Sequence, residues 1–161
     1  MIKNELKITT SSPEETREFG TRIGELSQPG DVILLVGELG AGKTCLTQGI
    51  AWGLGIADYA LSPSFVIMRE LYGKLPLYHL DLYRLENPEE IIDLGLDDYL
   101  YGNGVCVVEW ADRGLEILPP ENILIKITSA GDRRDFQLIP SGEHYREMIE
   151  KLTENPVRGK S

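Results

Sequence analysis

The sequence predicts an α/β fold whose mixed, mainly parallel sheet is flanked by helices. Two uninterrupted apolar segments, DVILLVG at 31–37 and GVCVVEW at 104–110, have the length and composition of strands buried on both faces, as in a parallel sheet. Predicted helices alternate with the early strands, which is typical of this class. Two further strand-like segments, at 64–71 and 75–85, are joined by YGK and predict an antiparallel hairpin portion.

The N-terminal part of the chain predicts a short strand at 6–10 followed by a helix. Ser12 is placed to cap this helix, and Pro13 suits its first position, where the missing N–H is not needed. Glu15 stands three residues after Ser12 and completes a capping box. Pro29 and Gly30 end the connection to the first buried strand.

The later elements follow from the same kinds of pattern. A helix is expected from Lys43 to Leu54, stopped by Gly55, and another over 87–100, with Asn87 as its cap. The remaining predicted elements are a short helix and turn at 111–121, strands at 122–128 and 134–140, and an amphipathic helix at 143–152. We expect a single domain over 1–152 and a flexible tail over 153–161.

Composition restricts the functional class. The chain has 161 residues, is 42% hydrophobic and carries a formal net charge of −10, which suits one globular domain and disfavours a free-standing nucleic-acid binder. Cys45 and Cys106 lack CxxC spacing, so we expect two reduced thiols rather than a disulfide or zinc site. With no apolar leader and no membrane-length apolar run, the expected location is cytoplasmic.

A phosphate-binding motif follows the first buried strand. GELGAGKT at 37–44 matches G-x-x-x-x-G-K-[ST] at every position, in the order strand, turn and helix that this motif requires. Its glycines let successive N–H groups face one anion, its lysine supplies a cation to phosphate, and its hydroxyl serves Mg²⁺. The expected nucleotide-binding residues are Gly37, Glu38, Leu39, Gly40, Ala41, Gly42, Lys43 and Thr44. The alternative is a glycine-rich turn with a solvated lysine.

A P-loop indicates phosphate binding but does not determine the reaction, because hydrolysis or transfer also needs a carboxylate near Mg²⁺. Glu109 directly follows the second buried strand and is the first candidate. Asp81 is the second, on the segment YHLDLYRL, whose alternation places His79, Asp81 and Tyr83 on one strand face. Each has a plainer interpretation: Glu109 as a solvated acid, Asp81 as an ion-pair partner, and His79 and Tyr83 as structural residues.

Missing motifs narrow the reaction class. The chain has neither N-K-x-D, the usual guanine reader, nor D-x-x-G after the P-loop, which disfavours a regulatory GTPase. A small-molecule kinase of this size carries an arginine-rich lid, which Arg133 and Arg134 could imitate. A lid-type kinase is therefore the alternative enzyme class.

Four segments together resemble one family. They are GELGAGKT, SPSF at 62–65, YHLDLYRL at 78–85 and VEW at 108–110, in this order on a chain of similar size. The sequence resembles the bacterial TsaE (YjeE) family, the P-loop ATPase of tRNA threonylcarbamoyladenosine synthesis. The pairing of H-x-D-x-Y-R with E-W is far more discriminating than the P-loop alone.

The resemblance implies ATP and Mg²⁺ as cofactors and TsaD and TsaB as partners. Those partners install threonylcarbamoyl on adenosine 37 of tRNAs that read codons beginning with A, and the TsaE-like member hydrolyses ATP to keep the complex turning over. It would reach tRNA only through the complex, which suits an acidic chain. The alternative is a nucleotide-dependent binding module in which ATP shapes an interface and hydrolysis is incidental.

The resemblance also assigns roles by position. Lys43 and Thr44 would hold phosphate and Mg²⁺, Glu109 would be the Mg²⁺-site acid, and Asp81 would share the metal or position water. The implied catalytic residues are thus Asp81, Glu109 and Lys43, and the implied metal ligands are Thr44, Glu109 and Asp81. Cys45, where threonine is common, would still offer its N–H to the α-phosphate.

Less specific assignments concern the surroundings of the nucleotide. Arg134 would lie near it, and residues 13–16 would flank the adenine. Residues 62–65 resemble a switch-like loop in which Ser64 replaces the more common threonine. His79, Tyr83 and Arg84 would shape the rim of the site or a partner surface.

Overall fold

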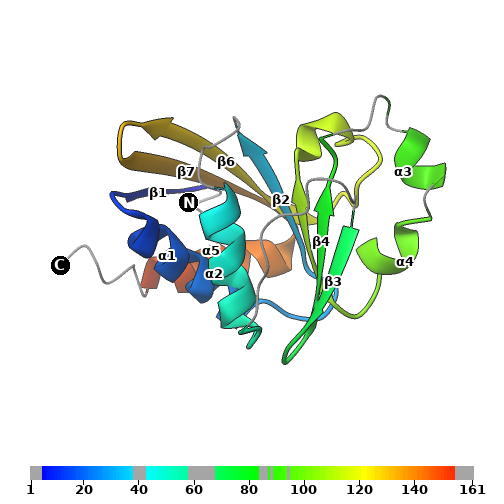
Figure 1. The fold of residues 1–161 in the computed structure, drawn as a ribbon, viewed down its shortest axis with the longest axis horizontal. Helices are drawn as coiled ribbons and strands as arrows, with labels where there is room; N and C mark the ends of the chain where they lie inside the picture. The colour runs from blue at the N-terminus through cyan, green and yellow to red at the C-terminus, as the bar shows by residue number, and fades with distance from the viewer. Residues whose placement is uncertain are drawn as a thin grey trace.

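The computed structural model of the chain describes residues 5–37, 43–57, 68–83, 87, 89–93 and 95–154. Seven strands form one sheet in the order β1-β7-β6-β2-β5-β4-β3 (Figure 1). The strands are β1 (Leu6–Thr10), β2 (Val32–Gly37), β3 (Met68–Tyr72), β4 (Pro76–Asp81), β5 (Val105–Glu109), β6 (Asn122–Ala130) and β7 (Arg133–Ser141). The helices are α1 (Pro13–Leu26), α2 (Lys43–Gly53), α3 (Glu89–Asp93), α4 (Asp97–Leu100), the 3₁₀ helix η1 (Ala111–Arg113) and α5 (Glu143–Glu154).

The centre of the sheet is parallel and its margins are antiparallel. β2 pairs in parallel with both β5 and β6, and β5 pairs in parallel with β4. The pairs β1–β7, β6–β7 and β3–β4 are antiparallel. The predicted α/β class, mixed sheet and hairpin are therefore confirmed, and the two most apolar segments of the sequence are the neighbouring strands β2 and β5.

Two apolar cores cover the two faces of the sheet. The larger joins α1, α2 and α5 to side chains that include Leu35, Leu77 and Val107. The smaller joins α4 and the η1 region to side chains that include Leu34 and Val108. Because successive strand residues point to opposite faces, positions 79, 81 and 109 belong to the face covered by α1 and α2.

The pair α1 and α2 packs at unusually close range on this face (Figure 1). Both helices carry glycine at a spacing of four residues. These glycines are Gly20 and Gly24 of α1 and Gly49 and Gly53 of α2. At each of them, an added Cβ atom would collide with a backbone carbonyl oxygen of the other helix. The glycines therefore permit a contact between helix backbones that any larger side chain would prevent.

The cap of α1 follows the predicted pattern with one change. The Ser12 hydroxyl accepts a hydrogen bond from the Glu15 N–H at 3.1 Å. The Glu15 carboxylate reaches back to the N–H of Ser11 at 2.7 Å, the residue before the cap. Both bonds satisfy N–H groups at the helix entrance.

Two predicted elements are wrong in extent. The helix expected over 87–100 is two short helices, α3 and α4, because Gly95 between them has a φ of 69° that a continuing helix does not allow. The strand expected over 75–85 ends at Asp81, because its carboxylate accepts the N–H of Tyr83 at 3.0 Å and turns the chain. Tyr83 therefore does not share a strand face with Asp81.

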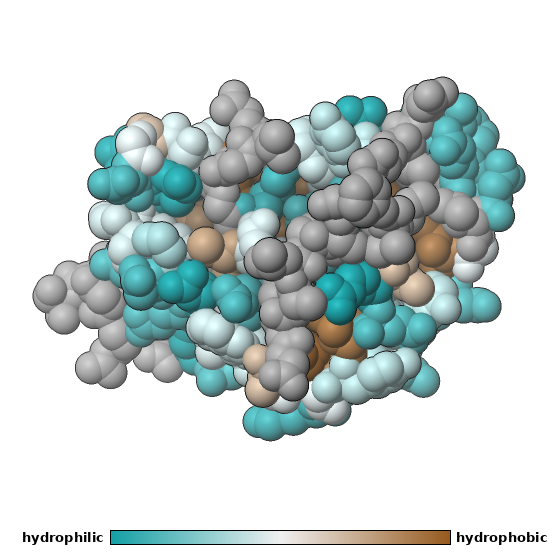
Figure 2. Space-filling view, viewed as in Figure 1, coloured by the Kyte–Doolittle hydropathy of each residue, from teal (hydrophilic) through white to brown (hydrophobic). Residues whose placement is uncertain are grey.

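The described surface is mostly hydrophilic in the view of Figure 2, where apolar residues form small, separate patches. Within the described ranges, every helix is too short or too polar to cross a membrane. Cys45 and Cys106 are both free thiols, as predicted, and burial raises the pKa of Cys106 to about 12.

Candidate functional site

Lys43, the last but one residue of the P-loop motif, is the first residue of α2 and is buried. Its ammonium donates a hydrogen bond to the carbonyl oxygen of Gly37 at 2.9 Å. Burial lowers the pKa of Lys43, while the negative charges of Glu109, Asp81 and Asp112 oppose that shift. A partly desolvated cation thus lies among acids, and its ammonium is the group here that can attract an anion such as phosphate.

Gly37 is needed at the end of β2 for a steric reason. An added Cβ atom would lie 2.7 Å from the carbonyl oxygen of Ile127 on the neighbouring strand β6. Thr44 follows Lys43 and is exposed, with α2 continuing behind it. The strand, the motif lysine and the helix therefore occur in the order that the motif predicts.

The two predicted acids end neighbouring parallel strands. Asp81 is the last residue of β4, Glu109 is the last residue of β5, and the two are partners in the strand register. Leu35 of β2 is the other register partner of Glu109. The carboxyl ends of parallel strands share one edge of a sheet, so both acids lie at the edge where Lys43 begins α2.

Glu109 is buried and paired with a histidine. Its Oε2 atom lies 2.5 Å from Nε2 of His79, and the side chains of Glu109 and His79 are 5% and 0% exposed. Burying a carboxylate requires a cation or hydrogen-bond donor, and His79 supplies one. The interpretation of Glu109 as a solvated acid is wrong, and so is the expectation that His79 shapes a rim or partner surface.

Asp81 is only partly buried. Burial raises the pKa of Asp81, the N–H of Tyr83 lowers it, the charge of Glu109 raises it, and the charges of His79 and Lys43 lower it. Asp81 is therefore electrostatically coupled to the same lysine and histidine as Glu109.

An aromatic group covers Lys43; Tyr83 was predicted at the rim of the site, whereas Trp110 was missed as a site residue. Trp110, directly after β5, has a left-handed backbone with a φ of 58°, uncommon for a non-glycine residue. The centroid of its ring lies 3.7 Å from Nζ of Lys43 and 4.8 Å from the ring centroid of Tyr83. The Arg113 guanidinium lies 5.4 Å from the Tyr83 centroid. Only the E-W pair in the sequence hinted at this arrangement.

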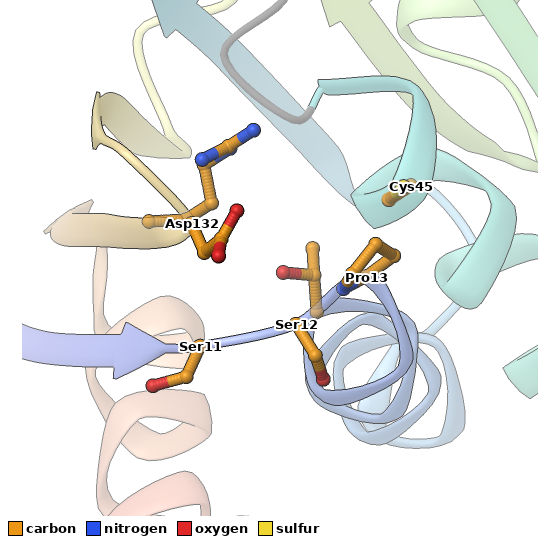
Figure 3. Close-up of a pocket in the computed structure, with 7 residues that line it drawn as sticks. Ser11, Ser12, Pro13, Cys45 and Asp132 are labelled. Atoms are coloured by element: carbon orange, nitrogen blue, oxygen red, sulfur yellow. The ribbon is translucent and has the colours of Figure 1, made fainter.

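A pocket of about 350 Å³ lies beside the start of α2 (Figure 3). Three segments distant in sequence line it: the β1–α1 connection, the first turn of α2, and the turn between β6 and β7. Its lining residues are Ser11, Ser12, Pro13, Thr16, Cys45, Asp132 and Arg134. The structure thus brings together Cys45, Arg134 and part of the segment expected to flank adenine.

Arg133 and Arg134 bond within their own hairpin. Arg134 donates to the carbonyl oxygen of Gly131 at 2.8 Å, and Arg133 forms an ion pair with Asp135 at 3.3 Å. Both arginines belong to β7, which β6 separates from β2. These contacts hold both arginines within the β6–β7 hairpin. The kinase alternative instead expects them in an arginine-rich lid.

Several predicted residues lie outside the described part of the chain. They are Glu38, Leu39, Gly40, Ala41 and Gly42 of the motif, residues 62–65 including Ser64, and Arg84. Among the described residues, there is no group of three or more His, Cys, Asp or Glu side chains that could hold a metal ion. The donors available at the edge are oxygens, one hydroxyl from Thr44 and the carboxylates of Asp81 and Glu109, which is the donor type that Mg²⁺ prefers.

Comparisons with known proteins agree with this geometry. The family model described as "Threonylcarbamoyl adenosine biosynthesis protein TsaE" matches residues 10–136. The tRNA threonylcarbamoyladenosine biosynthesis protein TsaE of Bacillus subtilis (strain 168) is 46% identical over 151 residues, covering 92% of this chain and 94% of that protein. The same-named protein of Treponema pallidum (strain Nichols) is 39% identical and covers 79% of this chain and 94% of its own length.

A solved structure has the same fold. The crystal structure of Bacillus subtilis YdiB superposes with a TM-score of 0.83 at 43% identity, covering 96% of this chain and 97% of that one. The family-model match extends over the P-loop, both acid-bearing strands, β6 and the first residues of β7. The chain therefore belongs to the TsaE family of P-loop proteins of tRNA threonylcarbamoyladenosine biosynthesis.

Proposed function

We propose that the chain is a cytoplasmic ATPase that binds ATP with Mg²⁺ and hydrolyses it to support turnover of a TsaD–TsaB complex. One observation carries the proposal: the motif lysine, Lys43, lies buried at the start of α2 within electrostatic reach of two carboxylates, Glu109 and Asp81, at one edge of the sheet. A P-loop lysine facing acids at the ends of parallel strands is the arrangement that phosphoryl transfer to water needs.

Each residue has a distinct proposed role. Lys43 compensates the charge of the β- and γ-phosphates, and the Thr44 hydroxyl with the Glu109 carboxylate would hold Mg²⁺. Asp81 shares the metal or orients the attacking water. Bound Mg²⁺ would supply Lewis-acid stabilisation of the phosphate oxygens. The pocket beside Cys45 has the position expected for the nucleoside.

Partners of the TsaD and TsaB type are proposed from family membership and the names of relatives. The acidic net charge of −10 supports protein partners over direct tRNA binding by this chain. The deciding experiment is reconstitution with TsaD, TsaB, substrate tRNA and threonylcarbamoyl-adenylate. Multiple turnovers that require both this chain and ATP are expected, and turnover without either would contradict the proposal.

Replacing Glu109 with alanine is expected to separate binding from hydrolysis. ATP affinity should stay within about tenfold, roughly 1.4 kcal/mol, while most hydrolysis is lost, because a Mg²⁺-site acid acts mainly on the transition state. Calorimetry and phosphate release measure the two effects. Asp31→Asn is a matched control, since Asp31 is also buried beside a histidine, His144, but directly precedes β2, at the opposite end of this strand from the P-loop motif. Full hydrolysis by Glu109→Ala would remove Glu109 from the mechanism.

Hydrolysis by the isolated chain is expected to be slow and to rise when TsaD and TsaB are added. The described part of the site offers Lys43 to the phosphates, while Arg113 packs near the rings of Tyr83 and Trp110. A partner that orders or completes the site would therefore increase the rate, as arginine fingers do. Phosphate release with and without both partners tests this, and equal rates would contradict it.

A nucleotide-dependent binding module is the second candidate function. It is favoured by Tyr83, which is 48% exposed and packs at a tilt against Trp110, whose ring lies on Lys43. A phosphate that draws the lysine away could change this surface and hence partner affinity. If this candidate holds, a hydrolysis-deficient Glu109→Ala chain should still support multiple turnovers in the reconstituted system, whereas the ATPase requires that it does not.

A further inference from the structure

We propose that His79 is a positioning residue for the ATPase reaction, holding the Glu109 carboxylate in the orientation in which it serves Mg²⁺. This inference rests on the proposed function, since it concerns the same acid. The observation behind it is the buried pair itself, with Nε2 of His79 at 2.5 Å from Oε2 of Glu109.

The strand register brings the pair together. His79 is opposite Val107 on β5, and Glu109 is two residues further along the same strand and on the same face. His79 thus lies two residues before the carboxyl end of β4, further from the edge that carries the acids, and contacts Glu109 from the core side. The contact uses Oε2, so we expect Oε1 to be the oxygen that serves the metal or water.

Burial makes this arrangement stiff. His79 is 0% exposed and the Glu109 side chain 5% exposed, so neither can exchange its partner for bulk water. Around them, Val107 and Leu77 are completely buried in the larger core, which restricts the rotamers of both side chains. A ligating carboxylate needs this kind of outer hydrogen bond to keep its geometry, and losing one costs about 10- to 100-fold in metal affinity or activity.

The chain contains a matched pair that has no place in the site. His144 of α5 and Asp31, the residue before β2, also form a histidine–carboxylate contact, with Nε2 at 2.8 Å from Oδ1. Asp31 is buried like Glu109, while His144 is partly exposed. If histidines here only stabilise the fold, substitutions in the two pairs should have the same kind of effect, which is loss of stability alone.

The kinetic test compares His79→Leu, His79→Gln and His144→Leu in ATP hydrolysis by the folded chain with its partners. His79→Leu should lower kcat by about 10- to 100-fold with the KM for ATP within about threefold, because the lost contact acts on the transition state. His79→Gln, whose amide can place a donor near the position of Nε2, should keep most of the kcat of the unaltered chain. His144→Leu should leave kcat unchanged.

Further variants keep the test decisive if leucine prevents folding. His79→Asn is polar but too short to place a donor at the same point, so it should show the same loss of kcat. In the Glu109→Gln background, replacing His79 should lower kcat no further, because the two residues act as a unit. Equal, additive losses in both backgrounds, or a full kcat in His79→Asn, would overturn the positioning role.

Spectroscopy tests the contact without turnover. The chain has two histidines, so ¹⁵N-histidine labelling gives a simple set of ring-nitrogen signals. Glu109→Gln should move the Nε2 signal of His79 and leave that of His144 in place, and Asp31→Asn should do the reverse. An unmoved His79 signal would overturn the inference. Full hydrolysis by Glu109→Gln would overturn the proposed function itself, whereas full hydrolysis by the His79 variants alone would leave that function standing.

Discussion

Replacing Lys43 with alanine is expected to weaken ATP binding by at least about 100-fold, close to 3 kcal/mol. Two contributions add: the charge-assisted bonds to phosphate are lost, and the phosphates then face the charges of Glu109 and Asp81 without a compensating cation. Calorimetric titration with ATP and Mg²⁺ measures the change. Hydrolysis should fall with binding.

The control for this variant is Lys151→Ala, which removes an exposed lysine from α5 and should leave the affinity unchanged. Thermal unfolding of the Lys43 variant must show a folded chain, so that loss of binding is not loss of structure. Unchanged ATP affinity in Lys43→Ala would refute the phosphate-binding assignment of GELGAGKT, and with it the proposed function.

Replacing Gly49 with alanine is expected to destabilise the fold by about 2–4 kcal/mol, although alanine is the better helix former by up to about 1 kcal/mol. The added methyl group would collide with the carbonyl oxygen of Arg17 on α1. Backbone cannot move aside as a side chain can, so the two helices must separate. A fall in melting temperature of roughly 5–15 °C follows for a domain of this size.

The same substitution should weaken ATP binding in the molecules that remain folded. α2 begins with Lys43, and α1 begins beside the pocket at Pro13, so separating the helices displaces both. Glu150→Ala, on the exposed face of α5, is the control and should change stability by less than about 0.5 kcal/mol. A melting temperature equal to or above that of the unaltered chain would show that the close helix contact is dispensable.

Local patterns predicted the elements whose causes are local. The strand at 32–37 and the helix from Lys43 follow from an apolar run and a motif, and both lie within a residue of their predicted bounds. The helix expected over 87–100 failed because a single residue, Gly95, adopts a positive φ. The strand expected to reach 85 failed because Asp81 bonds to the backbone two residues later, which alternation alone does not reveal.

Contacts between distant segments could not be predicted from the sequence. His79 and Glu109 were both singled out, but their pairing depends on the register of β4 against β5, which no local pattern determines. The role of the glycines in α1 and α2 depends on the opposite helix backbone, which lies far away in the sequence. The contact between Trp110 and Lys43 likewise depends on a left-handed turn that the residue type does not suggest.

The buried pair of His79 and Glu109 also has a consequence for how the chain finds its native strand alignment. Since side chains alternate between faces, sliding β4 by one residue against β5 would turn His79 into the smaller apolar core and bring Leu80 against Glu109. A carboxylate stranded against leucine is far costlier than any exchange among apolar neighbours. Misaligned registers are therefore energetically disfavoured. A correctly folded chain thus has Glu109 at the phosphate-binding edge of the sheet.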